Sequence, residues 1–427
     1  MSREPVGVIG TGYVGLVTAA GFAELGSEVW CVDVDQAKIA GLRAGEIPIH
    51  EPGLEQVVAE QRDRLHFSTD VGPALEHAQL LLVAVGTPST YSGDADLSAV
   101  SAVVNGLPAS DRHAVVMKST VPVGTGTTVR RLLADQGKGG LAYVSCPEFL
   151  REGSALRDFR HPDRVVIGDG GGWAGDAVAE LYAPLGAPTM RTDVPSAEMV
   201  KLASNAFLAT KISFINEIAN VCEETGADVV EVARGMGLDG RIGSSFLHAG
   251  LGFGGSCFPK DVSALKQLAG NSGYHFQLLG AVIEVNELQK RRVVAKLEKH
   301  LGDLVGRRIA LLGLAFKPDT DDMREASSLV LSARLLAEGA RVHAYDPVAE
   351  ERARELMPGV EFSQTALDAL AGADAAVLVT EWPELVGLDW SRAAEAMGGS
   401  LVVDGRNALD PEAVRGAGLT YEGIGRP

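Results

Sequence analysis

The chain has 427 residues, of which 46% are hydrophobic and 22% are charged, and its formal net charge at pH 7 is −18. This length predicts two or three domains, and the composition is that of an ordinary globular protein. The negative charge argues against binding to nucleic acid or to an anionic membrane, because both need a basic patch. The longest apolar run, residues 80–85, is too short to span a bilayer.

The first residues contain no long apolar segment, so we expect no signal peptide. The four cysteines show no CxxC spacing and stand at positions 31, 146, 222 and 257. So few thiols in so long a chain indicate a reducing compartment rather than a disulfide framework. We therefore expect a cytoplasmic protein.

The first predicted element is a short buried strand, residues 6–9, which leads into Gly10-Thr-Gly-Tyr-Val-Gly15. A helical pattern follows, and a second strand, residues 28–32, ends at Asp33. A GxGxxG sequence between a strand and a helix, with an acidic residue 18 positions later, is typical of dinucleotide binding. The pyrophosphate would lie at the helix N-terminus. Asp33 would bind the adenosine ribose and repel a 2′-phosphate, so the sequence predicts NAD rather than NADP.

Further strands are predicted at residues 80–85, 114–118, 141–145 and 165–167. Polar residues follow their carboxyl ends, where open α/β sheets bind ligands. Thr120, Glu148 and Glu152 should therefore face the cofactor crevice, and the two acids could share a helical face. Taken singly, they also fit a capping threonine and two solvated acids.

A long helix is predicted from Ser196 to about Thr225, with Lys201 and Asn205 on one stripe. A lysine on a mostly buried helix is costly without a partner, although its side chain could also reach the surface. Further helices are predicted at residues 227–236, 258–270 and about 276–300.

Four glycines between residues 250 and 255 precede Cys257, and a helix pattern follows Pro259. A thiol at a helix N-terminus is favoured as the nucleophilic thiolate. Lys260 adds a nearby positive charge, and Asp261 can lie on the same face of the first turn. The same pattern fits a buried cysteine that acts as a small hydrophobic residue.

The last third of the chain is a second series of strands, predicted at residues 308–312, 341–345, 375–380 and 401–404. It lacks GxGxxG, so we expect no second dinucleotide. Lys317, Arg324 and Arg406 gather at the strand ends, which indicates a site for a different phosphate-bearing ligand. Scattered surface basic residues are the alternative.

These patterns predict an α/β protein with two Rossmann-like doubly wound domains, joined by a long central helix and a helical dimerisation region. The predicted boundaries are 1–195 for the NAD-binding domain, 196–302 for the helical dimerisation and catalytic region, and 303–427 for the C-terminal Rossmann-like domain with the second phosphate-bearing ligand.

The chain resembles, over nearly its whole length, the nucleotide-sugar 6-dehydrogenases of the UDP-glucose/GDP-mannose dehydrogenase family, and most closely those that oxidise UDP-glucose. The motifs that carry the resemblance, in the family's order, are GTGYVG at 10–15, KSTVPVGT at 118–125, PEFLREGSAL at 147–156, KLASNAFLATKISFIN at 201–216, GFGGSCFPKD at 252–261, FKPDTDDMRE at 316–325 and DGRN at 404–407. One mild departure is Pro88-Ser89, where relatives commonly have Pro-Thr.

The resemblance implies that the C6 hydroxyl of UDP-glucose is oxidised by NAD in two steps to the carboxylate of UDP-glucuronate, without a metal. Cys257 would form a thiohemiacetal and then a thioester, and Lys201 and Asn205 would stabilise the oxyanion. Asp261 would act as a base or hold water beside the thiol. Glu148 would activate the hydrolytic water, and Thr120 would position it.

The resemblance also assigns binding residues. For the cofactor it implies Gly10, Gly12, Tyr13, Val14, Gly15, Asp33, Lys38, Gly86, Thr87, Pro88, Ser119, Thr120, Glu152, Lys260 and Arg324. For the nucleotide sugar it implies Glu148, Phe149, Leu150, Arg151, Glu152, Lys201, Asn205, Phe253, Gly254, Gly255, Lys317 and Arg406. Arg241 would reach the substrate across the interface of a homodimer.

Three other functions fit parts of the sequence. The same reaction could act on dTDP-glucose, GDP-mannose or a UDP-N-acetylhexosamine. A two-electron β-hydroxyacid dehydrogenase would share the first domain and the helical middle, but would need neither Cys257 nor residues 307–427. A non-catalytic NAD-sensing protein would leave the thiol and the paired acids without a purpose.

Overall fold

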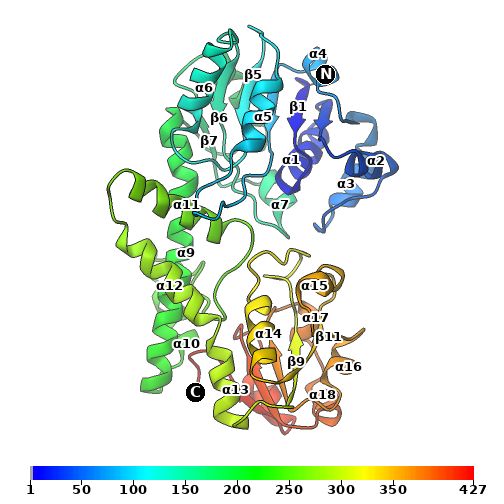
Figure 1. Ribbon diagram of the computed structural model, residues 1–427, viewed down its shortest axis with the longest axis vertical. Helices are drawn as coiled ribbons and strands as arrows, with labels where there is room; N and C mark the ends of the chain where they lie inside the picture. Colours follow the sequence, from blue (N-terminus) through cyan, green and yellow to red (C-terminus); the bar gives the residue numbers. More distant parts are fainter. Residues whose placement is uncertain (1–2) are drawn as a thin grey trace. The chain divides into compact units, whose positions relative to one another are not determined.

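The computed structural model describes residues 3–427 (Figure 1). The chain forms two compact units. The first contains the residues up to Ser204 together with Gln267–Tyr274, and the second contains Asn205–Lys266 together with His275–Pro427. The division falls inside two helices, α9 (Val194–Thr225) and α11 (Phe258–Asn271).

The first unit is built on an eight-stranded sheet in the order β3-β2-β1-β4-β5-β6-β7-β8. Neighbouring strands are parallel except for the pair β6 and β7. The strand order reverses between β1 and β4, which is where doubly wound sheets bind ligands. The strands are β1 (Val6–Ile9), β2 (Val29–Val32), β3 (Leu65–Ser68), β4 (Leu80–Val83), β5 (Ala114–Met117), β6 (Ala142–Ser145), β7 (Val165–Gly168) and β8 (Thr189–Thr192).

Both faces of the central strands β1, β4 and β5 are buried, which explains their apolar runs. Alternate residues of β4 belong to two different apolar clusters, Leu80 and Leu82 to one and Leu81 and Val83 to the other. The covering helices are α1 (Tyr13–Glu24), α2 (Gln36–Ala44), α3 (Leu54–Glu60), α4 (Gly72–His77), α5 (Ser98–Gly106), α6 (Thr125–Asp135), α7 (Ala155–Arg160) and α8 (Trp173–Tyr182).

The long helix α9 begins two residues before the predicted start and ends at the predicted residue. The stretch predicted as one helix over 276–300 is two helices, α12 (Gln277–Gln289) and α13 (Arg292–Leu301). The remaining helix of the middle region is α10 (Val229–Gly237).

The second unit contains a six-stranded sheet in the order β11-β10-β9-β12-β13-β14, with every neighbouring pair parallel. Its strands are β9 (Arg308–Leu312), β10 (Arg341–Tyr345), β11 (Glu361–Phe362), β12 (Ala375–Leu378), β13 (Leu401–Asp404) and β14 (Thr420–Glu422). Its helices are α14 (Ser327–Ala337), α15 (Glu350–Leu356), α16 (Ala366–Leu370), α17 (Pro383–Val386), α18 (Trp390–Ala396) and α19 (Pro411–Gly416).

One apolar core joins this sheet to the helical region of the same unit. Ile215 and Ala219 of α9 and Leu297 of α13 belong to the cluster that contains Leu311 of β9. The predicted α/β class with two Rossmann-like sheets and a long helix is therefore confirmed. Within residues 3–427, no helix is both long enough and apolar enough to cross a membrane.

Candidate active site

The glycine turn between β1 and α1 has the backbone that a dinucleotide requires. Gly10 has a φ of +97°, and a Cβ on Gly15 would lie 1.8 Å from the carbonyl oxygen of Gly10. No described atom would lie within 4 Å of a Cβ on Gly12. The helix N-terminus is therefore open at Gly12, where a pyrophosphate can approach the backbone closely.

Asp33, at the end of β2, is held in a fixed orientation beside this turn. Its Oδ2 accepts hydrogen bonds from the Thr11 amide and hydroxyl, both at 2.8 Å, and from Lys38 Nζ at 3.0 Å. Its Oδ1 accepts from the Asp35 amide at 3.1 Å. Burial works against the charge, but the hydrogen bonds from Thr11, Asp35 and Lys38 outweigh it and lower the pKa of Asp33. A fixed carboxylate suits ribose hydroxyls and repels a 2′-phosphate.

The loops that follow β4 and β5 are bonded to each other. The Thr87 hydroxyl donates to the Thr120 carbonyl at 2.8 Å, and the Ser119 hydroxyl donates to the Val85 carbonyl at 2.7 Å. These contacts place the segments 86–88 and 119–120 side by side at the carboxyl edge of the sheet, as the sequence predicts.

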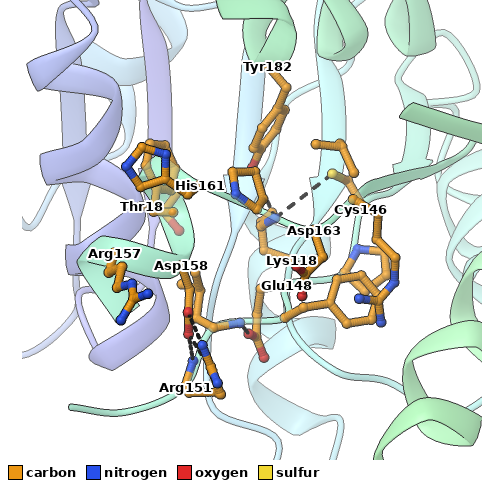
Figure 2. A pocket seen from close by; sticks show the side chains of 17 residues that line it. Thr18, Lys118, Cys146, Glu148, Arg151, Arg157, Asp158, His161, Asp163 and Tyr182 are labelled. Carbon is orange, nitrogen blue, oxygen red and sulfur yellow. Dashed lines mark hydrogen bonds and ion pairs between the residues drawn. The ribbon is translucent and has the colours of Figure 1, made fainter. Parts of the chain in front are cut away.

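A cavity of about 210 Å³ lies beside Glu148 (Figure 2). Lys118 lies in its wall, with Nζ 3.0 Å from the Tyr182 hydroxyl and 3.9 Å from Cys146 Sγ. Burial opposes the lysine charge, but Cys146, Tyr182 and Glu148 outweigh it, so the pKa of Lys118 is raised. Burial also raises the pKa of Tyr182 to about 12.

Glu148 and Lys201 form a buried ion pair. Glu148 Oε1 lies 3.0 Å from Lys201 Nζ, and the two side chains are 5% and 4% exposed. The Leu150 amide donates to Glu148 Oε2, and Lys201 Nζ stands 5.4 Å from the centre of the Phe149 ring. Lys201 is therefore not a lysine that reaches solvent, and the alternative left open by the sequence is wrong.

The segment around Glu148 differs from the expectation in one respect. Residues 146–152 form no helix, so Glu148 and Glu152 do not share a helical face. The reason is that Pro147 stands two residues after the end of β6 and the Glu148 side chain accepts a hydrogen bond from the Leu150 amide, which keeps this segment irregular. Arg151 is exposed, and its guanidinium pairs with Asp158.

In the second unit, Asn205 and Lys260 both contact Asp261. Asn205 Nδ2 donates to Asp261 Oδ2 at 2.7 Å, and Lys260 Nζ lies 2.6 Å from Asp261 Oδ1. The Asp261 amide donates to the Cys257 carbonyl at 2.8 Å, so the aspartate stands in the turn that Cys257 begins. Asp261 is fully buried.

Of the four cysteines, all within the described part of the chain, Cys257 alone is half-exposed, and it directly precedes α11. Burial raises the pKa of Cys31 to about 12, and burial also raises the pKa of Cys222. Cys146 is buried beside Lys118. Access therefore favours Cys257 as the nucleophile.

The glycines before Cys257 let the loop pack closely on other segments of the same unit. A Cβ on Gly254 would lie 2.2 Å from the Glu325 carbonyl oxygen, and one on Gly255 would lie 2.7 Å from the Phe316 ring. Arg406 donates to the carbonyls of Val379, Gly252 and Phe316 at 2.7, 3.1 and 3.2 Å. Arg406 thus joins the strand end at β12 to the glycine loop.

Lys317, Arg324 and Arg241, the other basic residues predicted to bind ligands, make contacts unlike those of Arg406. Lys317 Nζ stands 5.3 Å from the centre of the Phe316 ring, and Arg324 pairs with Asp322. The Arg324 carbonyl accepts from the Gly255 amide at 2.8 Å, so the segment 316–325 adjoins the glycine loop. Arg241 is 89% exposed and pairs with Asp239 on its own turn.

Two buried glutamates near these segments have no recognisable signal in the sequence. Glu51 accepts hydrogen bonds from the Gly153 and Leu156 amides, and Glu198 accepts from the Gly124 and Gly126 amides. Neither glutamate belongs to a sequence motif. Only the contacts made across long sequence separations distinguish them from surface acids.

Comparison with known proteins covers nearly the whole chain. Three models of the UDP-glucose/GDP-mannose dehydrogenase family match: the NAD binding domain at residues 4–186, the central domain at 195–288 and the UDP binding domain at 310–411. UDP-glucose 6-dehydrogenase TuaD of Bacillus subtilis is 46% identical, over 99% of this chain and 94% of its own. UDP-glucose 6-dehydrogenase of Pseudomonas aeruginosa is 49% identical, over 98% of this chain and 97% of its own.

Solved structures agree with these relatives. A UDP-glucose dehydrogenase from the archaeon Pyrobaculum islandicum has a TM-score of 0.92 and 41% identity, and the match covers 100% of this chain and 99% of that one. A UDP-D-ManNAc dehydrogenase from Pyrococcus horikoshii has a TM-score of 0.85 and 27% identity, over 99% of both chains.

Proposed function

Because this chain belongs to the UDP-glucose/GDP-mannose dehydrogenase family, we propose that it oxidises the C6 hydroxyl of UDP-glucose to the carboxylate of UDP-glucuronate with two equivalents of NAD. The main structural support for a four-electron reaction is the environment of Cys257. It is a half-exposed thiol at a helix start, beside a buried aspartate. A two-electron alcohol dehydrogenase needs no such nucleophile.

NAD, when bound, would supply the acceptor for one hydride in each oxidation. The glycine turn Gly10–Gly15 would hold its pyrophosphate, and Asp33 would hold the adenosine ribose, since the open position at Gly12 and the fixed carboxylate fit these groups. The segments 86–88 and 119–120 would border it.

Cys257 acts between the two oxidations. The alcohol first loses a hydride and a proton to give the aldehyde. The thiolate adds to the aldehyde carbon, which makes a thiohemiacetal from which a second hydride can leave. The adduct carries its charge on oxygen, so loss of that hydride alone leaves a thioester on sulfur. Water then adds to the thioester carbon, the C–S bond breaks, and the carboxylate and the free thiol result.

The buried polar groups would serve the charged states of this sequence. Lys201 supplies positive charge, and Asn205 a hydrogen bond, for oxygen that becomes negative at the reacting carbon. Glu148 accepts a proton from the hydrolytic water, which Thr120 positions. Asp261 orients Asn205 and Lys260, and acts as a base or holds water near the thiol.

The uridine diphosphate would be bound in the second unit, where the family's UDP binding domain model matches. Lys317 and Arg406 would contact the substrate there, Arg324 would contact NAD, and Phe253, Gly254 and Gly255 would line the sugar. A β-hydroxyacid dehydrogenase does not account for this domain. We also propose the boundaries 1–195, 196–302 and 303–427 for the functional regions.

We propose a cytoplasmic homodimer, formed through the helical middle. Phe207, Phe214 and Val221 on α9 are 66%, 48% and 56% exposed. They recur at intervals of seven residues, which is the spacing of a helix seam that packs on another helix. A second copy of this chain offers the same seam, and Arg241 would then serve the neighbouring subunit's substrate.

The experiment that tests the function is the end-point yield of NADH with limiting UDP-glucose. We expect two NADH per sugar and no free aldehyde. An end point of one NADH would contradict the thioester route. Parallel turnover with dTDP-glucose, GDP-mannose and UDP-N-acetylmannosamine tests the sugar, because the Pyrococcus horikoshii relative is named for a different one. A higher kcat/KM with any of these would replace UDP-glucose as the substrate.

A further inference from the structure

Glu51 is a buried acid in the loop before α3, and its carboxylate binds two separate segments of the first unit. It is 6% exposed. The Tyr13 hydroxyl donates to Oε2, the Gly153 amide donates to the same oxygen at 2.7 Å, and the Leu156 amide donates to Oε1 at 3.2 Å. The Gly153 amide also lies 2.6 Å from the Tyr13 hydroxyl oxygen.

These contacts connect the two ligand-binding segments of the unit. Tyr13 is the first residue of α1, and it lies inside the glycine turn that suits the cofactor pyrophosphate. Gly153 directly follows Glu152, in the segment 147–156. The family resemblance assigns residues 149–152 of this segment to the sugar, and the proposed function assigns Glu148 to water activation. Glu51 and the Tyr13 hydroxyl therefore form a polar link between the cofactor turn and the sugar segment.

The link also substitutes for a local helix cap. Ser154 occupies the N-cap of α7, but the described contacts include no cap hydrogen bond from its side chain. Glu51 supplies that bond from a distant part of the chain, through the Leu156 amide. The start of α7 thus depends on a carboxylate that Tyr13 helps to orient.

We propose that Glu51 and the Tyr13 hydroxyl are positioning groups that couple occupancy of the cofactor turn to the order of the segment 147–156. A cofactor bound at the α1 N-terminus fixes Tyr13, which fixes Glu51, which fixes the Gly153 and Leu156 amides. By reciprocity, a sugar held by that segment would favour the same cofactor-bound state. The assignment of the segment to the sugar rests on the proposed function, whereas the link itself does not.

Hydrogen exchange tests the link directly, because the Gly153 and Leu156 amides donate the hydrogen bonds to Glu51. Exchange is measured on the full-length protein with and without saturating NADH, using overlapping peptides that resolve these two amides. In the wild-type protein, we expect NADH to slow their exchange by at least about fivefold, the lower end of ordinary site–site coupling.

Two substitutions break the link, and a third is a matched control. Tyr13→Phe removes only the hydroxyl and keeps the ring, and Glu51→Gln removes the charge. In both, we expect the effect of NADH on the two amides to fall below about twofold at saturating NADH. Glu198→Gln is the control, because Glu198 is 2% exposed and likewise accepts two backbone amides, from Gly124 and Gly126 at 2.7 and 2.8 Å. It should retain the wild-type response even if it lowers stability.

The wild-type protein overturns the proposal if NADH leaves both amides unchanged. The proposal is also overturned if NADH slows the exchange of the two amides in Tyr13→Phe as much as in the wild type. Direct contact between the cofactor and Glu152 would then explain the protection. Tyr13→Phe also keeps the test decisive if Glu51→Gln fails to fold. No sugar is present, so failure of the link is distinguishable from failure of the proposed function. In turnover, Tyr13→Phe should raise the KM for UDP-glucose more than it lowers kcat.

Discussion

The buried Glu148–Lys201 pair makes a quantitative prediction about stability. At 3.0 Å and an effective dielectric constant of about 20, the attraction between the two charges is on the order of 5 kcal/mol. Desolvation of two buried ions offsets most of this gain, so the intact pair adds little net stability. Removal of one partner leaves the other charge buried without its direct counter-ion, which costs about 3–5 kcal/mol.

We therefore expect Lys201→Met to lower the free energy of unfolding by about 3–5 kcal/mol, and Glu148→Gln to lower it comparably. The double substitution should cost far less than the sum, because no unpaired charge remains. Urea unfolding followed by circular dichroism measures all three. The control is Arg160→Met, which breaks the partly exposed Arg160–Glu24 pair and should cost about 1 kcal/mol or less.

Two results would refute this reasoning. One is a Lys201→Met protein within about 1 kcal/mol of wild type, which would mean that solvent reaches Glu148. The other is additivity in the double variant, which would mean that the two charges do not interact. Either result would also remove the structural basis for Lys201 as a fixed positive charge at the reacting oxygen.

Four further predictions concern other parts of the molecule. Cys257→Ser should bind NAD and UDP-glucose but form no UDP-glucuronate at a useful rate, and full product formation by this variant would contradict the assignment of Cys257 as the nucleophile. Glu148→Gln should instead accumulate an acyl-enzyme that is visible by denaturing mass spectrometry. Asp33 should make kcat/KM with NAD exceed that with NADP by more than about tenfold, and Asp33→Ser should narrow the gap; equal use of NADP by the wild type would contradict the assignment of Asp33 to the ribose. Phe214→Asp should convert the dimer to a monomer in sedimentation experiments at micromolar concentration, and a monomeric wild type would exclude the proposed interface. Burial opposes the charge of Glu422, but hydrogen bonds from His300 and Lys296 outweigh it and lower its pKa, so the stability that this carboxylate contributes is present at pH 7 and is lost as the pH falls below the ordinary value of 4.5. The melting temperatures of wild type and Glu422→Gln should therefore differ at pH 7 and converge at low pH, and an equal difference at both pH values would contradict this.

Several features of this protein could be predicted from its sequence because they depend on residues that are close together along the chain. The strand–glycine–helix pattern at residues 6–24 indicates a dinucleotide turn. The turn requires a positive φ at Gly10 and no Cβ at Gly15, and both requirements arise within the turn itself. The position of Cys257 before α11 follows from Pro259 and the helical period. The two series of buried strands follow from apolar runs alone.

Helix boundaries were less predictable where no local signal marks them. The stretch 276–300 has one continuous helical period, yet the helix ends at Gln289 and another begins at Arg292. Glu148 and Glu152 have helical spacing, but Pro147 and the hydrogen bond from the Leu150 amide to Glu148 keep the segment irregular instead. Local contacts outweighed periodicity in that segment.

The buried polar contacts were decided only by the tertiary structure. Lys201 could have reached solvent, and its partner Glu148 lies in a loop more than fifty residues earlier in the chain. Glu51 resembles any surface acid until the fold brings Tyr13 and Gly153 to it. A buried charge or amide must find a partner somewhere, because an unpaired one is costly, but sequence spacing does not indicate which residue will meet it. Only the packing of distant segments determines that.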